Sequence, residues 1–179
     1  MTQNLYAIVG RSGAGKDYVV NRLCEWGGFK KAISHTTRPP RSGEANTHIF
    51  VSQAEFDKLR ENMVAYTNFN GYDYGTTAEV LNQSDFFIVD PAGVEYMQEH
   101  ADKLNRPVVV VEIQANTKTC FTRMLQRGDG VIKAAQRIDH DSKAFAGFKP
   151  HVYFVNNKSG DQCAESILLW IAAREGLDM

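Results

Sequence analysis

The chain has little cysteine, no long apolar run and no excess of charge of either sign. Its three cysteines, Cys24, Cys120 and Cys163, are odd in number and lack metal-type spacing, which disfavours a disulfide scaffold and a zinc site. No apolar run approaches the roughly 18 residues that a membrane span needs, and the N-terminus carries neither a basic leader nor an alanine-type cleavage site. We therefore expect a cytoplasmic protein without a membrane partner.

The overall charge is balanced but unevenly distributed. The 179 residues include 20 Lys and Arg and 21 Asp and Glu, and they have the composition of one globular domain. This balance gives no reason to expect nucleic-acid binding. Residues 1–43, however, hold seven basic and only two acidic side chains. This local excess is a first indication of an anion site near the N-terminus.

Short apolar runs alternate with helical patterns along the chain. The runs, rich in Val, Ile and aromatic residues, predict buried strands at 5–9, 86–89, 108–113 and 152–155. Helical patterns cover about 15–26, 53–62, 92–104, 116–127, 131–145 and 161–175. The alternation predicts an α/β fold with a mostly parallel sheet covered on both faces. Residues 34–84, polar and rich in Thr, Asn and Gly, interrupt it and predict an inserted lobe.

The most specific motif is the phosphate-binding loop pattern G-x-x-x-x-G-K, which lies between the first strand and the first helix. Its glycines let consecutive N–H groups point at a phosphate, and Lys16 can reach the outer phosphates. The candidate ATP-binding residues here are Gly10, Arg11, Ser12, Gly13, Ala14, Gly15, Lys16 and Asp17. Asp17 stands where Ser or Thr normally supplies a hydroxyl to Mg²⁺. It is either the metal ligand or a favourable acid in the first helical turn.

Two further motifs follow in the inserted region. Residues 34–44 read Ser-His-Thr-Thr-Arg-Pro-Pro-Arg-Ser-Gly-Glu, and residues 70–77 read Asn-Gly-Tyr-Asp-Tyr-Gly-Thr-Thr. Arg38 and Arg41, three residues apart and stiffened by the two prolines between them, suit a second phosphate separate from the one in the loop. Together with the phosphate-binding loop, these motifs resemble the guanylate kinase family in order and spacing over essentially the whole chain.

The resemblance implies a P-loop kinase three-layer fold and a single domain over residues 1–179. Its core would comprise 1–33 and 85–179, with a mixed monophosphate-binding lobe at about 34–84 and a helical lid at about 123–146. The implied substrates are small molecules, namely ATP with Mg²⁺ as the donor and a monophosphate as the acceptor. The resemblance implies no nucleic-acid partner, and the chain would act as a monomer or homodimer.

The resemblance also implies roles for single residues. The acceptor would contact Ser34, Arg38, Arg41, His48, Tyr74, Thr76 and Asp90. The catalytic cations would be Lys16, Arg38 and the lid arginines Arg127 and Arg137. Asn156 matches a segment that touches the donor adenine, although a strand-ending turn is an equal alternative. His48 replaces a usual phosphate-binding tyrosine and either donates a ring N–H or is a plain polar strand residue.

Two departures from the family pattern leave the acceptor open. Ala65 stands where guanylate kinases carry a glutamate that reads guanine, and Ile88 replaces an acid. Alanine cannot accept a hydrogen bond, and specificity built on hydrogen bonds depends on every buried partner. GMP or dGMP come first as acceptors. The alternatives are ribose 1,5-bisphosphate, as in the phosphokinases that make PRPP, a relaxed deoxynucleotide specificity as in phage-type kinases, and a non-catalytic protein-binding module.

Overall fold

The computed structural model describes residues 2–40, 48–69 and 71–177. Its strands are β1 (Leu5–Val9), β2 (His35–Thr36), β3 (Ile49–Phe50), β4 (Met63–Phe69), β5 (Tyr72–Thr77), β6 (Phe86–Ile88), β7 (Val108–Gln114) and β8 (Val152–Val155). Its α-helices are α1 (Lys16–Gly27), α2 (Gln53–Leu59), α3 (Ala78–Asn82), α4 (Pro91–Glu99), α5 (Thr117–Gln126), α6 (Val131–Ala144) and α7 (Gly160–Glu175). Short 3-10 helices follow α2 and α4, at Arg60–Asn62 and Ala101–Lys103.

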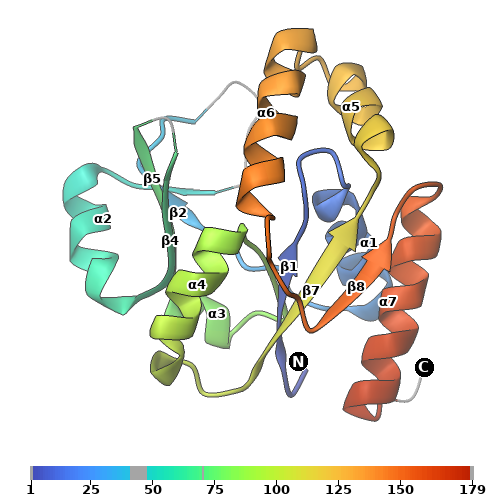
Figure 1. The fold of residues 1–179 in the computed structure, drawn as a ribbon. Helices are drawn as coiled ribbons and strands as arrows, with labels where there is room; N and C mark the ends of the chain where they lie inside the picture. Colours follow the sequence, from blue (N-terminus) through green and yellow to red (C-terminus); the bar gives the residue numbers. More distant parts are fainter. Residues whose placement is uncertain (1, 41–47, 70, 178–179) are drawn as a thin grey trace.

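The predicted parallel core sheet is confirmed. Its strand order is β6-β1-β7-β8, and every pairing in it is parallel. Tyr6 of β1 lies opposite both Phe86 of β6 and Val109 of β7, so β1 runs through the interior of the sheet. Helices α1 and α7 lie beside each other on one side of this sheet, and α4 lies on the other (Figure 1).

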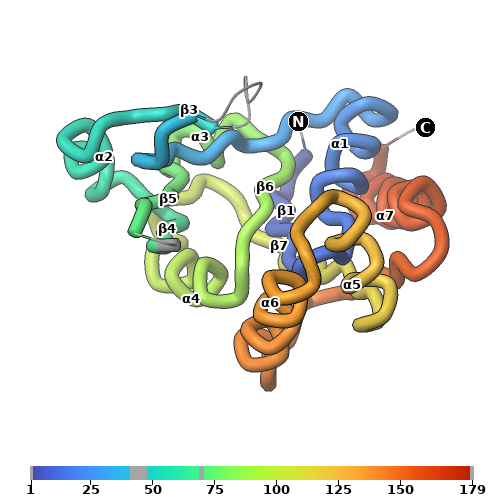
Figure 2. Tube along the Cα trace, turned by 90° about the horizontal axis from the view of Figure 1, so that it is seen from above, coloured from blue at the N-terminus to red at the C-terminus, as the bar shows by residue number. Residues whose placement is uncertain are grey.

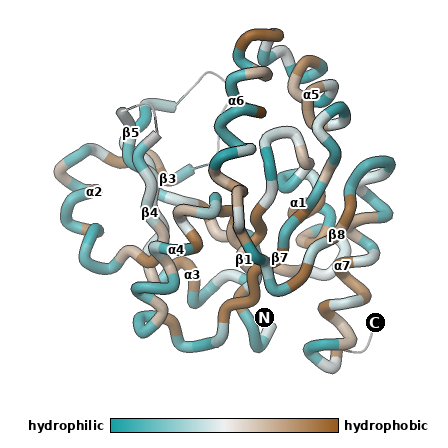
Figure 3. The backbone as a smooth tube through the Cα atoms, viewed as in Figure 1, coloured by the Kyte–Doolittle hydropathy of each residue, from teal (hydrophilic) through white to brown (hydrophobic). Residues whose placement is uncertain are grey.

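Strand β1 is buried on both faces because alternate residues enter two separate hydrophobic clusters. Tyr6 and Ile8 pack into the cluster that contains α1 and α7. Leu5, Ala7 and Val9 pack into the cluster on the side of α4. Figure 3 shows this hydrophobic centre in brown around β1, whereas α2 is mostly hydrophilic. Burying a large apolar side chain contributes about 1.5–3 kcal/mol, so these clusters hold the phosphate-binding loop that follows β1 on a rigid base.

Strand β8 differs from its prediction as a buried strand. It lies at the edge of the sheet, where Phe154 packs edge-to-face on Trp170 of α7. Tyr153 and Val155, on the other face of the strand, are 59% and 56% exposed. An edge strand with one face covered needs only every second residue to be apolar, so its continuous apolar run does not correspond to two buried faces.

A second, mixed sheet forms the inserted lobe, with strand order β3-β2-β5-β4. Strands β2 and β3 pair in parallel, whereas β5 pairs antiparallel with both β2 and β4. The β4–β5 hairpin sets Ala65 opposite Thr76, so it brings a departure from the family pattern beside a predicted acceptor-site residue. The lobe lies to the left of the core strands in Figure 1.

Helices α5 and α6 hold most of residues 123–146, and their role as a lid stays a prediction. They stand above the carboxyl ends of the core strands in Figure 1, and the view from above places α6 between the lobe and α7 (Figure 2). Asn116 begins α5 by accepting a hydrogen bond from the backbone N–H of Thr119. None of the helices that the structure describes has the length and hydropathy to cross a bilayer.

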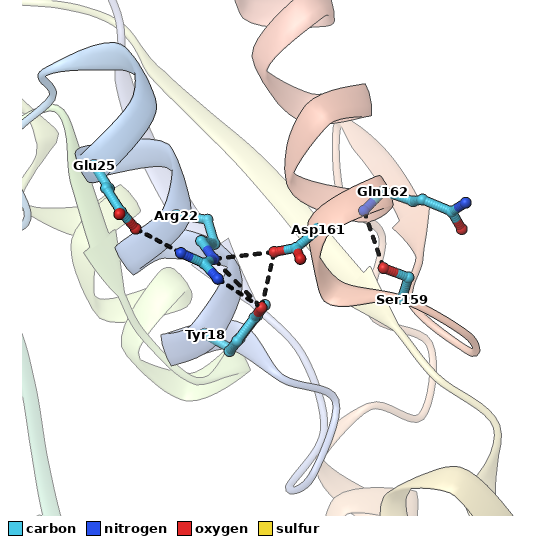
Figure 4. A network of polar contacts seen from close by, with 6 residues as sticks. All are labelled: Tyr18, Arg22, Glu25, Ser159, Asp161 and Gln162. Atoms are coloured by element: carbon cyan, nitrogen blue, oxygen red, sulfur yellow. Dashed lines mark hydrogen bonds and ion pairs between the residues drawn. The ribbon is translucent and has the colours of Figure 1, made fainter.

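A surface network joins α1 to α7 (Figure 4). Asp161 of α7 accepts hydrogen bonds from Tyr18 at 2.8 Å and from Arg22 Nε at 3.0 Å. Arg22 also pairs with Glu25 at 2.7 Å, and Ser159 caps the N-terminus of α7. Exposed ion pairs contribute about 0–1 kcal/mol each, so the hydrophobic cluster beneath them supplies most of the stabilisation between these helices.

The carboxylate of Glu175, at the end of α7, binds the segment that leads into β1. It accepts hydrogen bonds from the backbone N–H of Gln3 at 2.6 Å and from the side-chain amide of Asn4 at 2.7 Å. The backbone N–H of Asn4 at 3.3 Å and, through a short bond, the hydroxyl of Tyr6 donate to it as well. Burial opposes ionisation, but these hydrogen bonds outweigh it and lower the pKa of Glu175.

Replacing Glu175 by glutamine is expected to lower the free energy of unfolding by about 1–3 kcal/mol near neutral pH, because a neutral amide accepts these bonds less well and presents its own N–H₂ to donors. The lowered pKa makes the carboxylate stabilising above the unfolded glutamate value of about 4.3. That contribution is lost as the pH falls through the folded-state pKa, so the wild type loses its advantage in acid.

Urea unfolding of both proteins near neutral pH and in acid measures this difference. Glu165→Gln is the matched control, because Glu165 is an exposed carboxylate on the same helix. A loss of stability that is equally large in acid, or equally large for Glu165→Gln, would contradict the assignment.

Candidate active site

The predicted phosphate-binding loop connects β1 to α1 and depends on two glycines. Gly13 has φ of 80° and Gly15 has φ of 92°, in the left-handed region where other residues are strained. A Cβ at Gly13 would also collide with the backbone carbonyl of Cys120, and one at Gly15 would lie 2.6 Å from Nδ2 of Asn156. The loop therefore leaves no room for side chains at these positions.

Lys16 is the first residue of α1 and bends back over the loop. Its Nζ donates hydrogen bonds to the backbone oxygens of Gly10 at 2.5 Å and Arg11 at 3.3 Å. Burial lowers the pKa of Lys16, and the negative charges of Asp17 and Asp141 oppose this shift. The ammonium group is thus held at the loop, where the predicted phosphates would bind.

Two side chains support the phosphate-binding loop by donating hydrogen bonds to its backbone oxygens. Arg123 of α5 donates to the backbone oxygens of Ala14 at 3.3 Å and Gly13 at 3.5 Å, and its other nitrogen lies 3.4 Å from Oδ1 of Asn156. Asn156, fully buried after β8, donates to the same oxygen of Ala14 at 2.9 Å. Arg123 is missing from the predicted site, and only its place one helical turn before Arg127 signals it. Contact between Asn156 and the donor stays a prediction.

A cavity of about 370 Å³ opens between the loop, the lobe and the helices α4 and α6. Its volume lies within the range of small-molecule sites, about 300–1,000 Å³. Of the predicted site residues, the cavity brings together Gly10, Ser12, Lys16, Ser34, His48, Tyr74, Thr76 and Asp90. Residues from the predicted donor and acceptor sets therefore line one cavity.

The lobe supplies a polar wall of this cavity. The hydroxyl of Ser34 lies 2.9 Å from Nδ1 of His48, whose ring packs against that of Tyr74 with 5.7 Å between centroids. Asp90 caps the N-terminus of α4 by accepting a hydrogen bond from the backbone N–H of Gly93 at 2.7 Å. Both departures from the family pattern, Ala65 and Ile88, line the same cavity as apolar side chains.

The predicted arginine pair of the lobe is described only in part. Arg38 is buried, donates to the backbone oxygen of Pro39 at 2.9 Å and lies over the ring of Phe50. Its guanidinium lies outside the lining of the cavity. Arg41 lies outside the described residues, so its predicted contact with the acceptor phosphate stays a prediction.

The predicted lid arginines converge on one carboxylate. Asp129, in the turn between α5 and α6, pairs with Arg127 at 2.5 Å and lies 3.7 Å from Nε of Arg137. The hydrogen bond from Arg127 is the main reason that the pKa of Asp129 is lowered. Both arginines are at least one-third exposed and lie outside the described lining of the cavity. The structure thus brings them to each other, outside the lining of the cavity that Lys16 enters.

Asp17, the predicted metal ligand, points to the side of α1. Its Oδ1 pairs with Nζ of Lys31 at 2.7 Å, and the side chain is 77% exposed. The sequence gives no sign of this pairing, because Lys31 lies beyond the end of α1 and reaches Asp17 only through the fold.

Comparison with known proteins agrees with this geometry. The family model described as "Guanylate kinase" matches residues 2–168. The chain belongs to the guanylate kinase family. A guanylate kinase of Neisseria meningitidis serogroup A is 44% identical over 142 residues, which cover 75% of this chain and 69% of that relative. A guanylate kinase of Neisseria meningitidis serogroup B has the same identity and coverage.

A solved structure extends the guanylate kinase likeness to the fold of nearly the whole chain. The crystal structure of guanylate kinase from Anaplasma phagocytophilum aligns with a TM-score of 0.63 and 20% identity, covering 97% of this chain and 87% of that one. At this identity the likeness concerns the fold alone. It confirms the prediction of a guanylate kinase fold with a parallel core sheet.

Proposed function

We propose that the chain is an ATP-dependent kinase that transfers the γ-phosphoryl group to GMP or dGMP. The observation that carries the proposal is the single cavity into which both Lys16 of the phosphate-binding loop and Ser34, Tyr74 and Thr76 of the lobe project. A transferase needs its donor and acceptor on facing walls of one enclosed site. The guanylate kinases of Neisseria, 44% identical to this chain, support the same activity.

The protein itself needs to contribute little covalent chemistry to this reaction. A phosphate monoester is already anionic at neutral pH, so its oxygen attacks the γ-phosphate without a strong general base. The protein must instead bring two highly charged groups together, stabilise the charge on the transferring group and exclude water. Lys16 and the loop amides serve the donor in this proposal, and Arg38 with Arg41 serves the phosphate of the acceptor.

We infer that movement of the lobe, at about 34–84, and of the lid, at about 123–146, completes the site. Arg127 and Arg137 now share the carboxylate of Asp129. On closure they exchange this carboxylate for oxygens of the transferring phosphoryl group, because a guanidinium binds both with the same paired N–H donors. Closure that requires both substrates also prevents transfer to water.

Magnesium fits this site as an ion that binds together with ATP. Among the described residues, no group of three or more His, Cys, Asp and Glu side chains is arranged to hold a metal. Mg²⁺ bound to nucleotides needs only one or two carboxylates, since phosphates and water supply its other ligands. Asp17 would provide the carboxylate after separating from Lys31, and the ion would neutralise charge on the phosphates.

The lid arginines are expected to act on the transition state. Replacing Arg127 or Arg137 by alanine should lower kcat by about 10²-fold or more while raising either KM by less, because their phosphate contacts form only on closure. Steady-state kinetics with both substrates varied measure this split. Lys133→Ala, which removes a cation from the same lid, is the control. A change confined to KM would show that the arginine contributes to substrate binding and not to the transition state.

Asp17 is expected to set the magnesium requirement. Asp17→Ala should raise the Mg²⁺ concentration needed for half-maximal rate, by about tenfold, because one protein ligand is lost. Titration of the rate with MgCl₂ at saturating ATP measures the effect. Lys31→Met, which removes only the ion-pair partner, should not raise that concentration. Equal magnesium dependence in Asp17→Ala and wild type would refute a metal role for Asp17.

The acceptor is identified by measuring ADP release with a panel of ribo- and deoxynucleoside monophosphates and with ribose 1,5-bisphosphate. We expect GMP or dGMP to be fastest, with weaker discrimination against other bases than a guanine-reading carboxylate would give, because Ala65 and Ile88 present apolar surface to the cavity. A faster rate with ribose 1,5-bisphosphate would replace the proposed acceptor. Absence of ADP release with every acceptor would refute catalysis and favour a binding module.

A further inference from the structure

A carboxylate of the lid occupies part of the phosphate-binding loop. Asp141 lies in the last turn of α6, and its Oδ2 accepts a hydrogen bond from the backbone N–H of Ser12 at 2.6 Å. The two residues are 129 positions apart in the chain, so this contact ties the lid directly to the loop. Asp141 is buried, whereas Asp139 on the same helix is exposed and pairs with Lys143.

Asp141 also acts on Lys16, the other anion-binding element of the loop. Asp141, Ser12 and Lys16 line the same cavity. The negative charge of Asp141 opposes the lowering of the Lys16 pKa that burial causes. The side chain of His140 also lies near Asp141, with Nδ1 3.6 Å from Oδ1 of the carboxylate. The positive potential of the loop and of Lys16 therefore already acts on an anion that belongs to the protein itself.

We propose that Asp141 is a positioning residue that competes with the donor phosphates for the phosphate-binding loop, so that ATP binding and release of the loop by α6 are coupled. This inference rests on the proposed function, since it takes ATP as the ligand of the loop. Two anions close to the same amide and ammonium groups repel each other, and each reduces the occupancy of the other.

The position of Asp141 on α6 links this competition to the lid arginines. Arg137 precedes Asp141 by four residues, so the two side chains project from the same side of the helix, one turn apart. Because α6 carries both side chains, a movement of the helix that withdraws the carboxylate from Ser12 also moves Arg137. Donor binding thereby removes from the loop the negative charge of Asp141, which repels the phosphates. It replaces this charge with the positive charge of Arg137, which attracts them.

Isothermal titration of the full chain with a non-hydrolysable ATP analogue and with ADP tests the proposal. Asp141→Asn keeps the size of the side chain and an oxygen that can accept the Ser12 N–H, but removes the charge. We expect it to lower the Kd of the ATP analogue by about fivefold or more, in the usual range of coupling between two sites, and to lower the Kd of ADP by less. Asp141→Glu, which retains the charge, should bind both nucleotides no more tightly than wild type.

Asp139→Asn is the matched control, because it removes the same charge from an exposed position of the same helix. A merely structural role for Asp141 would weaken nucleotide binding in Asp141→Asn, whereas competition strengthens it. If Asp141→Asn does not fold, as judged by thermal unfolding, Asp141→Ser takes its place.

Weaker or unchanged affinity of the charge-neutral variant, with normal binding by wild type, would overturn the inference and leave the proposed function intact. An equal gain in Asp139→Asn would overturn it as well, since the effect would then be general electrostatics. Wild-type protein that binds neither nucleotide would overturn the proposed function and this inference together.

Discussion

The close approach of α5 to the phosphate-binding loop is the constraint on which the site depends. The backbone carbonyl of Cys120 occupies the space that a side chain on Gly13 would need, and Arg123 from the next turn donates to the oxygens of Gly13 and Ala14. The loop is thereby fixed from the lid side by α5 and from the core side by the fully buried β1. A rigid loop presents its amides without reorganisation, which is the property that electrostatic catalysis requires.

The same arrangement gives α5 and α6 different relations to the loop. α5 contacts it through backbone and through donors to carbonyl oxygens, which leaves the loop N–H groups available. α6 contacts it through an acceptor, the carboxylate of Asp141, which takes one of those N–H groups. Helix α5 therefore supports the loop, whereas α6 takes up one of the N–H donors with which the loop would bind phosphate.

Much of the core was predictable from the sequence because each core element satisfies its own local rule. The apolar runs and the glycine-lysine motif identify the four core strands, the loop and α1 without reference to the rest of the chain. The lobe resists such prediction, since β2 and β3 have two residues each and show no periodicity. In the site, motif residues such as Ser34 and Tyr74 were predictable. The contacts of Asp141, Arg123 and Lys31 were not, because each joins segments that only the fold brings together.

The bond between Glu175 and Gln3 joins residues 172 positions apart, which bears on how the chain folds. Contacts of such separation are slow to form, since the loop-closure entropy must be overcome before they stabilise anything. During synthesis, the segment before β1 leaves the ribosome before its partner on α7, which follows only after the lobe, α5 and α6 have been made. The core sheet therefore gains this contact only after α7 has been made.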